Sequence, residues 1–364
     1  MRIGVLGGGQ LGRMLALAGL PMGLEFVFID PAKDAPMESI GRHICANYDD
    51  ETALDELASR ADIVTYEFEN ILLSSVDYLS RKVPVVPSRK ALEISQERLF
   101  EKSFLKKIGI PVGQFCPIDS LDDIENAARV TGLPAVLKTR RFGYDGKGQR
   151  VVATIDELTT AVREMISVPL ILEKKIDFKR EMSMMVVRNL SGETAYYPLV
   201  QNEHRRGILY TSAAPAPNIE SLAGIAEEYA GKLLTALGYA GLLTIEFFET
   251  DEGLLVNEFA PRVHNSGHWT IEGAVTSQFE NHLRAILDYP LGSTDLTGYS
   301  KMINLVGALP SFGEIAKFSD THIHYYGKSP KPSRKVGHIT VRGNDFNTVE
   351  KKADEIIRLI EVVY

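Results

Sequence analysis

Cysteine is scarce in this chain: Cys45 and Cys116 are the only two among 364 residues. Two cysteines cannot build a disulfide framework, and neither lies at the spacing of a metal-binding motif. No stretch approaches the roughly 20 apolar residues of a membrane-spanning helix. The chain opens on a strand-like segment without the pattern of a signal peptide. These absences favour a cytoplasmic protein without a membrane partner.

Basic residues are in the minority, with 40 lysines and arginines against 48 aspartates and glutamates, a net charge of −8. A general nucleic-acid binder needs a basic excess, so this balance argues against a nucleic-acid partner. Local basic clusters can still bind small phosphorylated ligands. Hydrophobic residues make up 45% of the chain, and its length suits two or three globular domains.

The pattern of apolar runs predicts a mixed α/β and α+β fold. Strands "RIGVLG", "EFVFID", "DIVTYEFE" and "VPVVP" alternate with helices that begin near Gln10, Glu51 and Ser74, which indicates a parallel, Rossmann-like sheet. One helix is predicted over 91–111, followed by a compact unit of helices and strands. Later segments are mostly strands, including "TAYYPLVQNEH". The predicted domains are 1–90, 91–178, 179–292 and a small β-rich 293–364.

The first turn raises the possibility of a dinucleotide. In "RIGVLGGGQLGRML" Gly7, Gly9 and Gly12 fit G-x-G-x-x-G, and Asp30 follows the next apolar run. An NAD-dependent oxidoreductase is therefore one interpretation. The motif alone is weak evidence, because similar turns occur without a dinucleotide. The start of the following helix remains a predicted anion site.

Two acids lie on neighbouring strands of a predicted hairpin, "GLLTIEFFETDEGLLVNEFAP". A three-residue loop places Glu246 opposite Glu258, and a four-residue loop places it opposite Asn257. Either register brings two carboxylates and an amide to one face. Neighbouring carboxylates repel and favour a cation between them, and oxygen ligands suit Mg²⁺. The alternative is a solvated sheet face, but the dense polar turn "RVHNSGHW" that follows favours a site.

A second group of polar residues surrounds a glycine-rich loop. Lys138 ends the strand "AVLK", and "GYDGKG" follows at 143–148, where glycines let backbone N–H groups approach phosphates. An exposed strand end and a flexible turn are the alternatives. The strand "LILEKKI" then ends in Glu173 and Lys174, a segment that could bind adenine and ribose, with Glu181 further on.

In this order the pieces resemble an ATP-grasp enzyme. "GGGQLGRML", "FGYDGKGQ", "NEFAPRVHNSGHWT" and "RKVGH" are similar to segments of the N5-carboxyaminoimidazole ribonucleotide synthase family of purine biosynthesis. The resemblance covers essentially the whole chain. It implies an ATP-dependent ligase that joins bicarbonate to 5-aminoimidazole ribonucleotide (AIR) through carboxyphosphate, with Mg²⁺ (or Mn²⁺) bound, in a homodimer. Glu97 departs from the family pattern, in which aspartate or asparagine is expected.

The resemblance also implies roles for particular residues. The ATP contacts implied are Arg98, Lys138, Gly143, Tyr144, Asp145, Gly146, Lys147, Gly148, Gln149, Glu173, Lys174, Lys175, Ile176, Glu181, His204, Asn257 and Glu258. The AIR contacts implied are Gln10, Tyr144, Asp145, Arg262, His264, Asn265, Ser266, Lys328, Arg334 and Lys335. The metal ligands implied are Glu246 and Glu258, and the catalytic residues are Lys138, Asp145, Arg262 and His264. Asp145 is the first candidate for the proton acceptor and His264 the second.

Three other functions are compatible with parts of the sequence. A formate-dependent glycinamide ribonucleotide transformylase or a biotin carboxylase would share the ATP residues, but the polar turn and "SRKVGH" argue against both. A non-catalytic nucleotide-binding module would not need Glu246, Asn257 and Glu258 together. The NAD interpretation predicts a fluorescence change when NADH is added.

Overall fold

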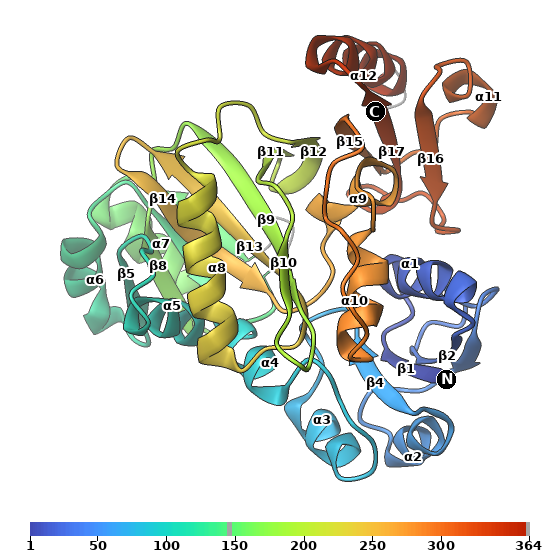
Figure 1. The fold of residues 1–364 in the computed structure, drawn as a ribbon. Coiled ribbons are helices and arrows are strands. Elements are labelled where there is room, and N and C mark those ends of the chain that lie inside the picture. The colour runs from blue at the N-terminus through green and yellow to red at the C-terminus, as the bar shows by residue number, and fades with distance from the viewer. Residues whose placement is uncertain (144–147, 362–364) are drawn as a thin grey trace.

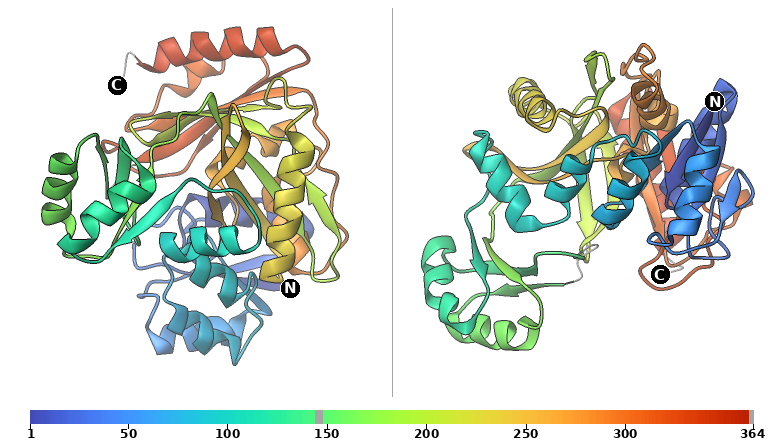
Figure 2. Two further views of the ribbon diagram at one scale, coloured as in Figure 1. Left: turned by 90° about the vertical axis from the view of Figure 1, so that its left-hand side faces the viewer. Right: turned by 90° about the horizontal axis from the view of Figure 1, so that it is seen from below.

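The computed structural model describes residues 1–143 and 148–361, and its strands form three sheets. An N-terminal sheet, a small sheet and a large sheet follow one another along the chain (Figure 1). The small sheet and its helices project from the rest of the molecule in the views of Figures 1 and 2. Within the described residues, no helix combines the length and apolar character needed to cross a membrane.

The N-terminal sheet is parallel, as predicted, with strand order β3-β2-β1-β4. Apolar cores lie on both faces, which explains why β1, β2 and β4 are mostly apolar and buried. Its strands are β1 (Arg2–Leu6), β2 (Glu25–Ile29), β3 (Arg42–Ile44) and β4 (Ile63–Tyr66). Its helices are α1 (Gln10–Gly19), η1 (Leu20–Met22), α2 (Glu51–Arg60) and α3 (Leu73–Ser80).

Two local predictions in this part of the chain are wrong. "VPVVP" forms only a single bridge, Val64 to Val85, since its prolines cannot donate to a ladder. The helix predicted over 91–111 is two helices, α4 (Arg89–Ser95) and α5 (Arg98–Lys107). Glu97 separates them in extended conformation (φ −134°) and caps α5 by accepting a hydrogen bond from Leu99 N.

The small sheet is antiparallel, with order β5-β8-β6-β7. Its two longer helices pack on it through one apolar core that includes Ile118, Ala127 and Leu158. The strands are β5 (Phe115–Ile118), β6 (Ala135–Thr139), β7 (Gln149–Val152) and β8 (Leu170–Lys174). The helices are η2 (Leu121–Asp123), α6 (Ile124–Thr131) and α7 (Ile155–Met165).

The large sheet has the order β14-β13-β9-β11-β12-β15-β17-β16, with β10 paired to β9. The C-terminal strands extend this sheet instead of forming their own. "TAYYPLVQNEH" is two strands, not one, because Pro198 lies between them. The strands are β9 (Arg180–Arg188), β10 (Thr194–Tyr196), β11 (Val200–Arg205), β12 (Ile208–Ala214), β13 (Gly241–Thr250), β14 (Gly253–Ala260), β15 (Tyr299–Val306), β16 (Thr321–Tyr325) and β17 (Lys335–Gly343).

Different helices cover the two faces of the large sheet (Figure 1). Leu243 and Met184 share a core with α8 (Ala223–Leu237), whereas Leu242 and Met185 share one with α10 (Gln278–Ile286) and α1. Since side chains alternate along a strand, Glu246 lies on the α10 face. The remaining helices are η3 (Asn265–Gly267), α9 (Thr270–Gly273), α11 (Phe312–Ile315) and α12 (Phe346–Glu361), which packs on β15 and β17.

His282 on α10 connects two sheets and gives the fold a predicted acid sensitivity. Its ring contacts Thr65 Oγ1 (2.9 Å) and accepts from Leu242 N (3.1 Å), and burial lowers the pKa of His282 to about 3. Below pH 6.5 His282 is protonated in the unfolded chain but remains neutral in the folded protein. The free energy of unfolding therefore decreases as the pH falls toward 3.

We therefore expect the thermal midpoint to fall between pH 7 and pH 5, and His282→Gln to flatten this dependence. The expected change in slope is about 1.4 kcal/mol per pH unit. Circular dichroism melts at several pH values measure it, with the exposed His322→Gln as the control that keeps the original slope. An unchanged slope in His282→Gln would contradict the assignment.

Candidate active site

The two hairpin acids face each other because β14 contains a bulge. Near the turn, Thr250 pairs with Gly253 and Phe247 with Val256, a register that would place Glu246 opposite Asn257. The register then shifts by one residue, and Glu246 pairs with Glu258. A bulge of this kind redirects side chains at a functional position. Both registers considered from the sequence therefore occur, on the two sides of the bulge.

Cations from two other elements surround Glu258. Arg98, the first residue of α5, lies 2.8 Å from Glu258 through Nη1. Lys102, one turn later, donates to the backbone oxygen of Asn257 (3.0 Å) and lies 3.3 Å from Glu173. Lys138 on β6 lies 2.9 Å from the same Glu173 oxygen. The hairpin, α5 and the small sheet thus meet in one network of charges.

Two glutamates, one just before α5 and one within it, position this network, and neither was predicted as a site residue. Glu97 is the N-cap of α5, so it fixes the end of the helix that presents Arg98. Glu101 is 2% exposed and accepts from Phe259 N (2.7 Å), which fastens α5 to β14. Burial and the charge of Glu258 raise the pKa of Glu101 to about 8. In the sequence, Glu101 could have been suspected because it lies one helical turn after Arg98 and next to Lys102.

The acids of the cluster differ in their protonation. Burial and the nearby Glu258 raise the pKa of Glu246 to about 7. Burial alone would also raise the pKa of Glu258, but Arg98 and Lys138 outweigh it and hold that pKa below its usual range. Likewise, burial works against ionisation of Glu173, while Lys102 and Lys138 hold its pKa at about 2. Of Glu173, Glu246 and Glu258, Glu246 is therefore the acid whose charge is least compensated.

The residues present fit a divalent cation bound together with phosphates. Glu246 and Glu258 are paired across the hairpin, and Asn257 Oδ1 is buried without a hydrogen-bond partner among the described residues. Mg²⁺ commonly takes one or two carboxylates and completes its ligands with water and substrate phosphates. No group of three or more histidines, cysteines or acids that could hold a metal occurs within 1–143 and 148–361. A Mg²⁺ ion here would depend on the nucleotide.

The hinge segment 173–176 offers fewer backbone groups than the sequence suggests. The N–H groups of Lys174 and Lys175 donate to Gln114 O (2.8 Å) and Pro134 O (3.3 Å). These two amides are therefore already used, and Ile176 remains a predicted adenine contact. On the adjoining strands, Glu181 lies 2.7 Å from His204 Nδ1. Burial opposes protonation of His204, but Glu181 and Glu246 raise its pKa above the usual range.

The glycine-rich loop is described at its two ends. Gly143 and Gly148 lie at these ends, Gly148 has a positive φ of 70°, and Gln149 begins β7 opposite Lys138. The predicted contacts Tyr144, Asp145, Gly146 and Lys147 lie outside the described residues. At the loop base, Arg141 donates to Gln96 Oε1 (2.6 Å), which links this loop to the end of α4.

The polar turn after β14 adjoins the acid pair. His264 Nε2 lies 3.4 Å from Glu246 Oε1, and its Nδ1 lies 2.9 Å from Ser266 Oγ. Burial, then the charges of Arg262 and Lys335, lower the pKa of His264 well below its usual range. His264 is therefore neutral, and Lys335 lies close enough for its charge to lower the pKa of His264.

Two neighbours of this turn were not predicted. Arg262 Nη2 lies 2.6 Å from Glu69, two residues beyond the buried Glu67 after β4, and Arg262 Nη1 donates to Val263 O (2.9 Å). Asn265 exchanges two hydrogen bonds with Asn304 of β15 (2.6 and 3.0 Å). A signal for Glu69 existed, because "YEFEN" stands at the carboxyl end of a parallel strand, where ligands bind.

The basic segment after β16 reaches the N-terminal domain. Lys328 Nζ donates to Gln10 Oε1, which joins two residues 318 positions apart that were both predicted to contact AIR. Arg334 is half-buried, and its Nη1 donates to Ser329 O (3.3 Å). The structure thus brings Gln10 and Lys328 together, and it places Lys335 near the polar turn.

The glycine turn of the first domain is occupied by the protein's own carboxylates. The N–H groups of Gly9 and Gly12 donate to Glu67, and Gly8 N donates to Asp30 (2.8 Å). The start of α1, expected to attract an external anion, therefore already holds Glu67. Asp30, the candidate for gripping a ribose, is bound to the turn. These contacts argue against the NAD interpretation, because the groups that would bind the dinucleotide are already hydrogen-bonded.

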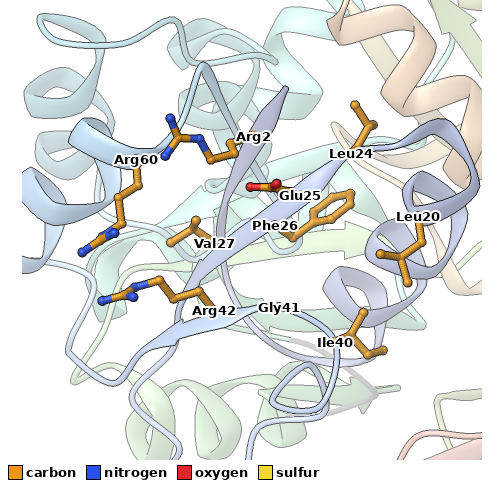
Figure 3. A pocket seen from close by; sticks show the side chains of 10 residues that line it. All are labelled: Arg2, Leu20, Leu24, Glu25, Phe26, Val27, Ile40, Gly41, Arg42 and Arg60. Carbon is orange, nitrogen blue, oxygen red and sulfur yellow. The ribbon is translucent and has the colours of Figure 1, made fainter.

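A cavity of about 350 Å³ lies elsewhere on the N-terminal domain (Figure 3). Apolar residues, three arginines and one glutamate line it: Arg2, Leu20, Leu24, Glu25, Phe26, Val27, Ile40, Gly41, Arg42 and Arg60. Predicted site residues are absent from this lining. The charge network, not this cavity, is the candidate active site.

Three family models match successive parts of the chain. Residues 1–96 match the ribonucleotide synthetase preATP-grasp domain, residues 103–279 the ATP-grasp domain, and residues 300–352 the phosphoribosylaminoimidazole carboxylase C-terminal domain. These matches, together with the charge network between the hairpin, α5 and the small sheet, define the class of the protein. It is an ATP-grasp ligase.

Individual relatives identify the family within the ATP-grasp ligases. The chain is 51% identical to N5-carboxyaminoimidazole ribonucleotide synthase of Pseudomonas aeruginosa over 99% of its length and 100% of the relative's. It resembles the crystal structure of N5-carboxyaminoimidazole ribonucleotide synthetase from Thermus thermophilus (TM-score 0.95, 49% identity, 98% of each chain covered). A structure from Aspergillus clavatus in complex with ADP and 5-aminoimidazole ribonucleotide has a TM-score of 0.92 at 30% identity, over 99% of this chain and 98% of that one. The chain belongs to the N5-carboxyaminoimidazole ribonucleotide synthase family.

Proposed function

We propose that this chain joins bicarbonate to the exocyclic amine of AIR, consumes ATP, and releases N5-carboxyaminoimidazole ribonucleotide, ADP and phosphate. The observation that supports it most is the 3.4 Å approach of His264 to Glu246. It connects the polar turn predicted to bind AIR with the acids predicted to bind the nucleotide's metal. A transformylase or a biotin carboxylase would share the acids but is not favoured by the family matches.

The chemistry needs stabilisation of negative charge and exclusion of water. Bicarbonate attacks the γ-phosphorus of ATP and gives carboxyphosphate, which either reacts with the amine directly or releases CO₂ to it. Phosphoryl transfer depends mainly on positioning and electrostatics. Lys138 joins the charge network through Glu173, and an incoming phosphate would compete with Glu173 for it. Closure of the site protects carboxyphosphate from hydrolysis.

Mg²⁺ bound by Glu246 and Glu258 would neutralise phosphate charge in this site. Mn²⁺ would be accepted by the same oxygen ligands. We further propose that the protein works as a homodimer in the cytoplasm, as the family resemblance implies. Sedimentation of the purified protein tests the dimer.

ADP formation is expected to require Mg²⁺ and to rise strongly when AIR is present, because the residues predicted to contact phosphate and those predicted to contact AIR meet at Glu246 and His264. A coupled assay, with bicarbonate, AIR and Mg²⁺ omitted in turn, measures this dependence. Stimulation by glycinamide ribonucleotide plus formate, but not by AIR, would overturn the substrate assignment. A fluorescence change on adding NADH would contradict the exclusion of NAD.

Arg334→Ala is expected to raise KM for AIR roughly tenfold, the scale of one charge-assisted hydrogen bond to a phosphate. A 5′-phosphate is remote from the reacting amine, so its contacts bind ground and transition states alike and affect KM more than kcat. Steady-state kinetics with each substrate varied measure this effect. The neighbouring exposed Lys331→Ala serves as a control. A rise in KM for ATP alone would place this segment in the nucleotide site instead.

A further inference from the structure

A row of buried polar side chains crosses the face of the large sheet that carries Glu246. Ser183 on β9 and Ser212 on β12 are fully buried, and Asn202 on β11 is 6% exposed. Ser183 pairs with Glu246 across the β9–β13 ladder. Polar groups buried at this depth in an apolar sheet are costly unless they are hydrogen-bonded. No functional role was predicted for any of the three.

These side chains form one continuous chain of hydrogen bonds toward the polar turn. Ser212 Oγ donates to Asn202 Oδ1 (2.7 Å), and Asn202 Nδ2 donates to Ser183 Oγ (2.9 Å). Ser183 Oγ then donates to Ser266 Oγ (2.8 Å). Because the asparagine amide has a distinct donor and acceptor, it gives the chain a direction. The Ser266 hydroxyl proton is therefore directed to its remaining neighbour.

That neighbour is Nδ1 of His264, 2.9 Å from Ser266 Oγ. The backbone N–H of Ser266 also donates to Nδ1 (3.3 Å), and an amide N–H cannot accept a proton. Nδ1 is thus an acceptor from two donors. A neutral imidazole with an accepting Nδ1 carries its proton on Nε2, the atom that faces Glu246 Oε1 at 3.4 Å.

We propose that Ser183, Asn202 and Ser212 are positioning residues that hold His264 as the Nε2–H tautomer. Resting on the proposed function, this makes His264 a hydrogen-bond donor at the acid pair and removes it as the acceptor of the amine proton. Nε2 already carries a proton, and Nδ1 already accepts from the hydroxyl and the backbone N–H of Ser266, so neither ring nitrogen is free to take another. The proton from AIR must therefore go to a different base.

The tautomer can be read directly from the protein without substrates. Long-range ¹H–¹⁵N correlation spectra of protein labelled at histidine nitrogen distinguish the two neutral tautomers and the imidazolium. His264→Gln identifies the His264 signals among the eight histidines. At neutral pH we expect a single Nε2–H form. An Nδ1–H form or an imidazolium in the unaltered protein overturns the proposal.

Two variants test the role of the polar row. Ser183→Ala removes the donor to Ser266 Oγ, so the row no longer orients the Ser266 hydroxyl, which can then turn away and accept from Nδ1–H. Asn202→Asp replaces the donating amide by an acceptor, so Ser183 would donate to residue 202 and no longer to Ser266. Both are expected to introduce the Nδ1–H form and to lower kcat roughly tenfold, the scale of one hydrogen bond, with little change in KM for ATP. If Asn202→Asp does not fold, Ser183→Ala still decides.

The matched control is Ser300→Ala, at a buried serine of β15 whose hydroxyl has no hydrogen-bond partner in the described part of the chain. It is expected to leave the tautomer and kcat unchanged. Ser183→Ala with an unaltered tautomer and full kcat would overturn the positioning role. The expected tautomer in a protein without AIR-dependent ADP formation would contradict the proposed function alone, because the spectra do not depend on turnover.

Discussion

Glu258→Gln is expected to lower kcat by at least about 10²-fold, the scale of removing one strong electrostatic contributor from an active site. The substitution keeps the shape of the side chain but removes one of the two charges proposed to hold Mg²⁺. It also leaves Arg98, 2.8 Å away, without its anionic partner. ADP formation at saturating Mg²⁺, ATP and AIR measures the effect. Turnover close to normal under these conditions would exclude the metal role.

The matched variant Glu246→Gln separates catalysis from folding. It should reduce kcat in the same way, but its effect on the stability of the metal-free protein has the opposite sign. The pKa of Glu246 is raised to about 7, so the folded protein holds a proton that the unfolded chain loses at lower pH. Stability is therefore lost as the pH rises through about 7.

We expect the thermal midpoint of Glu246→Gln to exceed that of the unaltered protein at pH 8, and this gain to disappear near pH 5. Glu258→Gln should instead lower the midpoint, because the charge of Glu258 is balanced by Arg98 and Lys138. From the sequence, both glutamates look like one repelling pair. Melting curves without Mg²⁺ at both pH values decide between these descriptions, and equal shifts would contradict ours.

The alternation of apolar runs predicted the parallel first sheet, the hairpin and most helices, because these patterns follow from local periodicity. It failed where a single residue changes the backbone. Glu97 in extended conformation splits a continuous helical pattern, and the bulge next to Asn257 changes a register that no apolar pattern records. Both features lie at the site, where local rules are commonly broken.

Partners far apart in the chain could not be predicted from spacing. Glu67 fills the glycine turn from the end of β4, a contact that only the folded sheet creates. Asn304 and Ser183 appear in the sequence as isolated polar residues within apolar strands. Their partners, Asn265 and Ser266, belong to a turn that packs over the sheet and lies far away in the sequence. Such residues can be suspected from burial of a polar side chain, but their partners cannot.

Substitution of Arg262 is expected to have the second large effect on activity. Its guanidinium lies 2.6 Å from Glu69 of the first domain and donates to Val263 O (2.9 Å), while its Nε is buried without a partner among the residues described. A planar group held by two contacts can direct its remaining donor at a ligand. Arg262→Ala is expected to lower kcat/KM for AIR by about 10² or more.

Arg262→Lys is the informative comparison, because it keeps the charge and removes the planar fork. A lysine cannot hold Glu69 and Val263 O and still present a directed donor, so we expect it to recover only a small part of the activity. Glu69→Gln keeps the arginine but weakens its anchor, and it should raise KM for AIR more than it lowers kcat. Steady-state kinetics with AIR and ATP varied separately distinguish these effects. Full activity in Arg262→Lys would show that charge alone suffices, and a rise confined to KM for ATP would mean that Arg262 contacts the nucleotide.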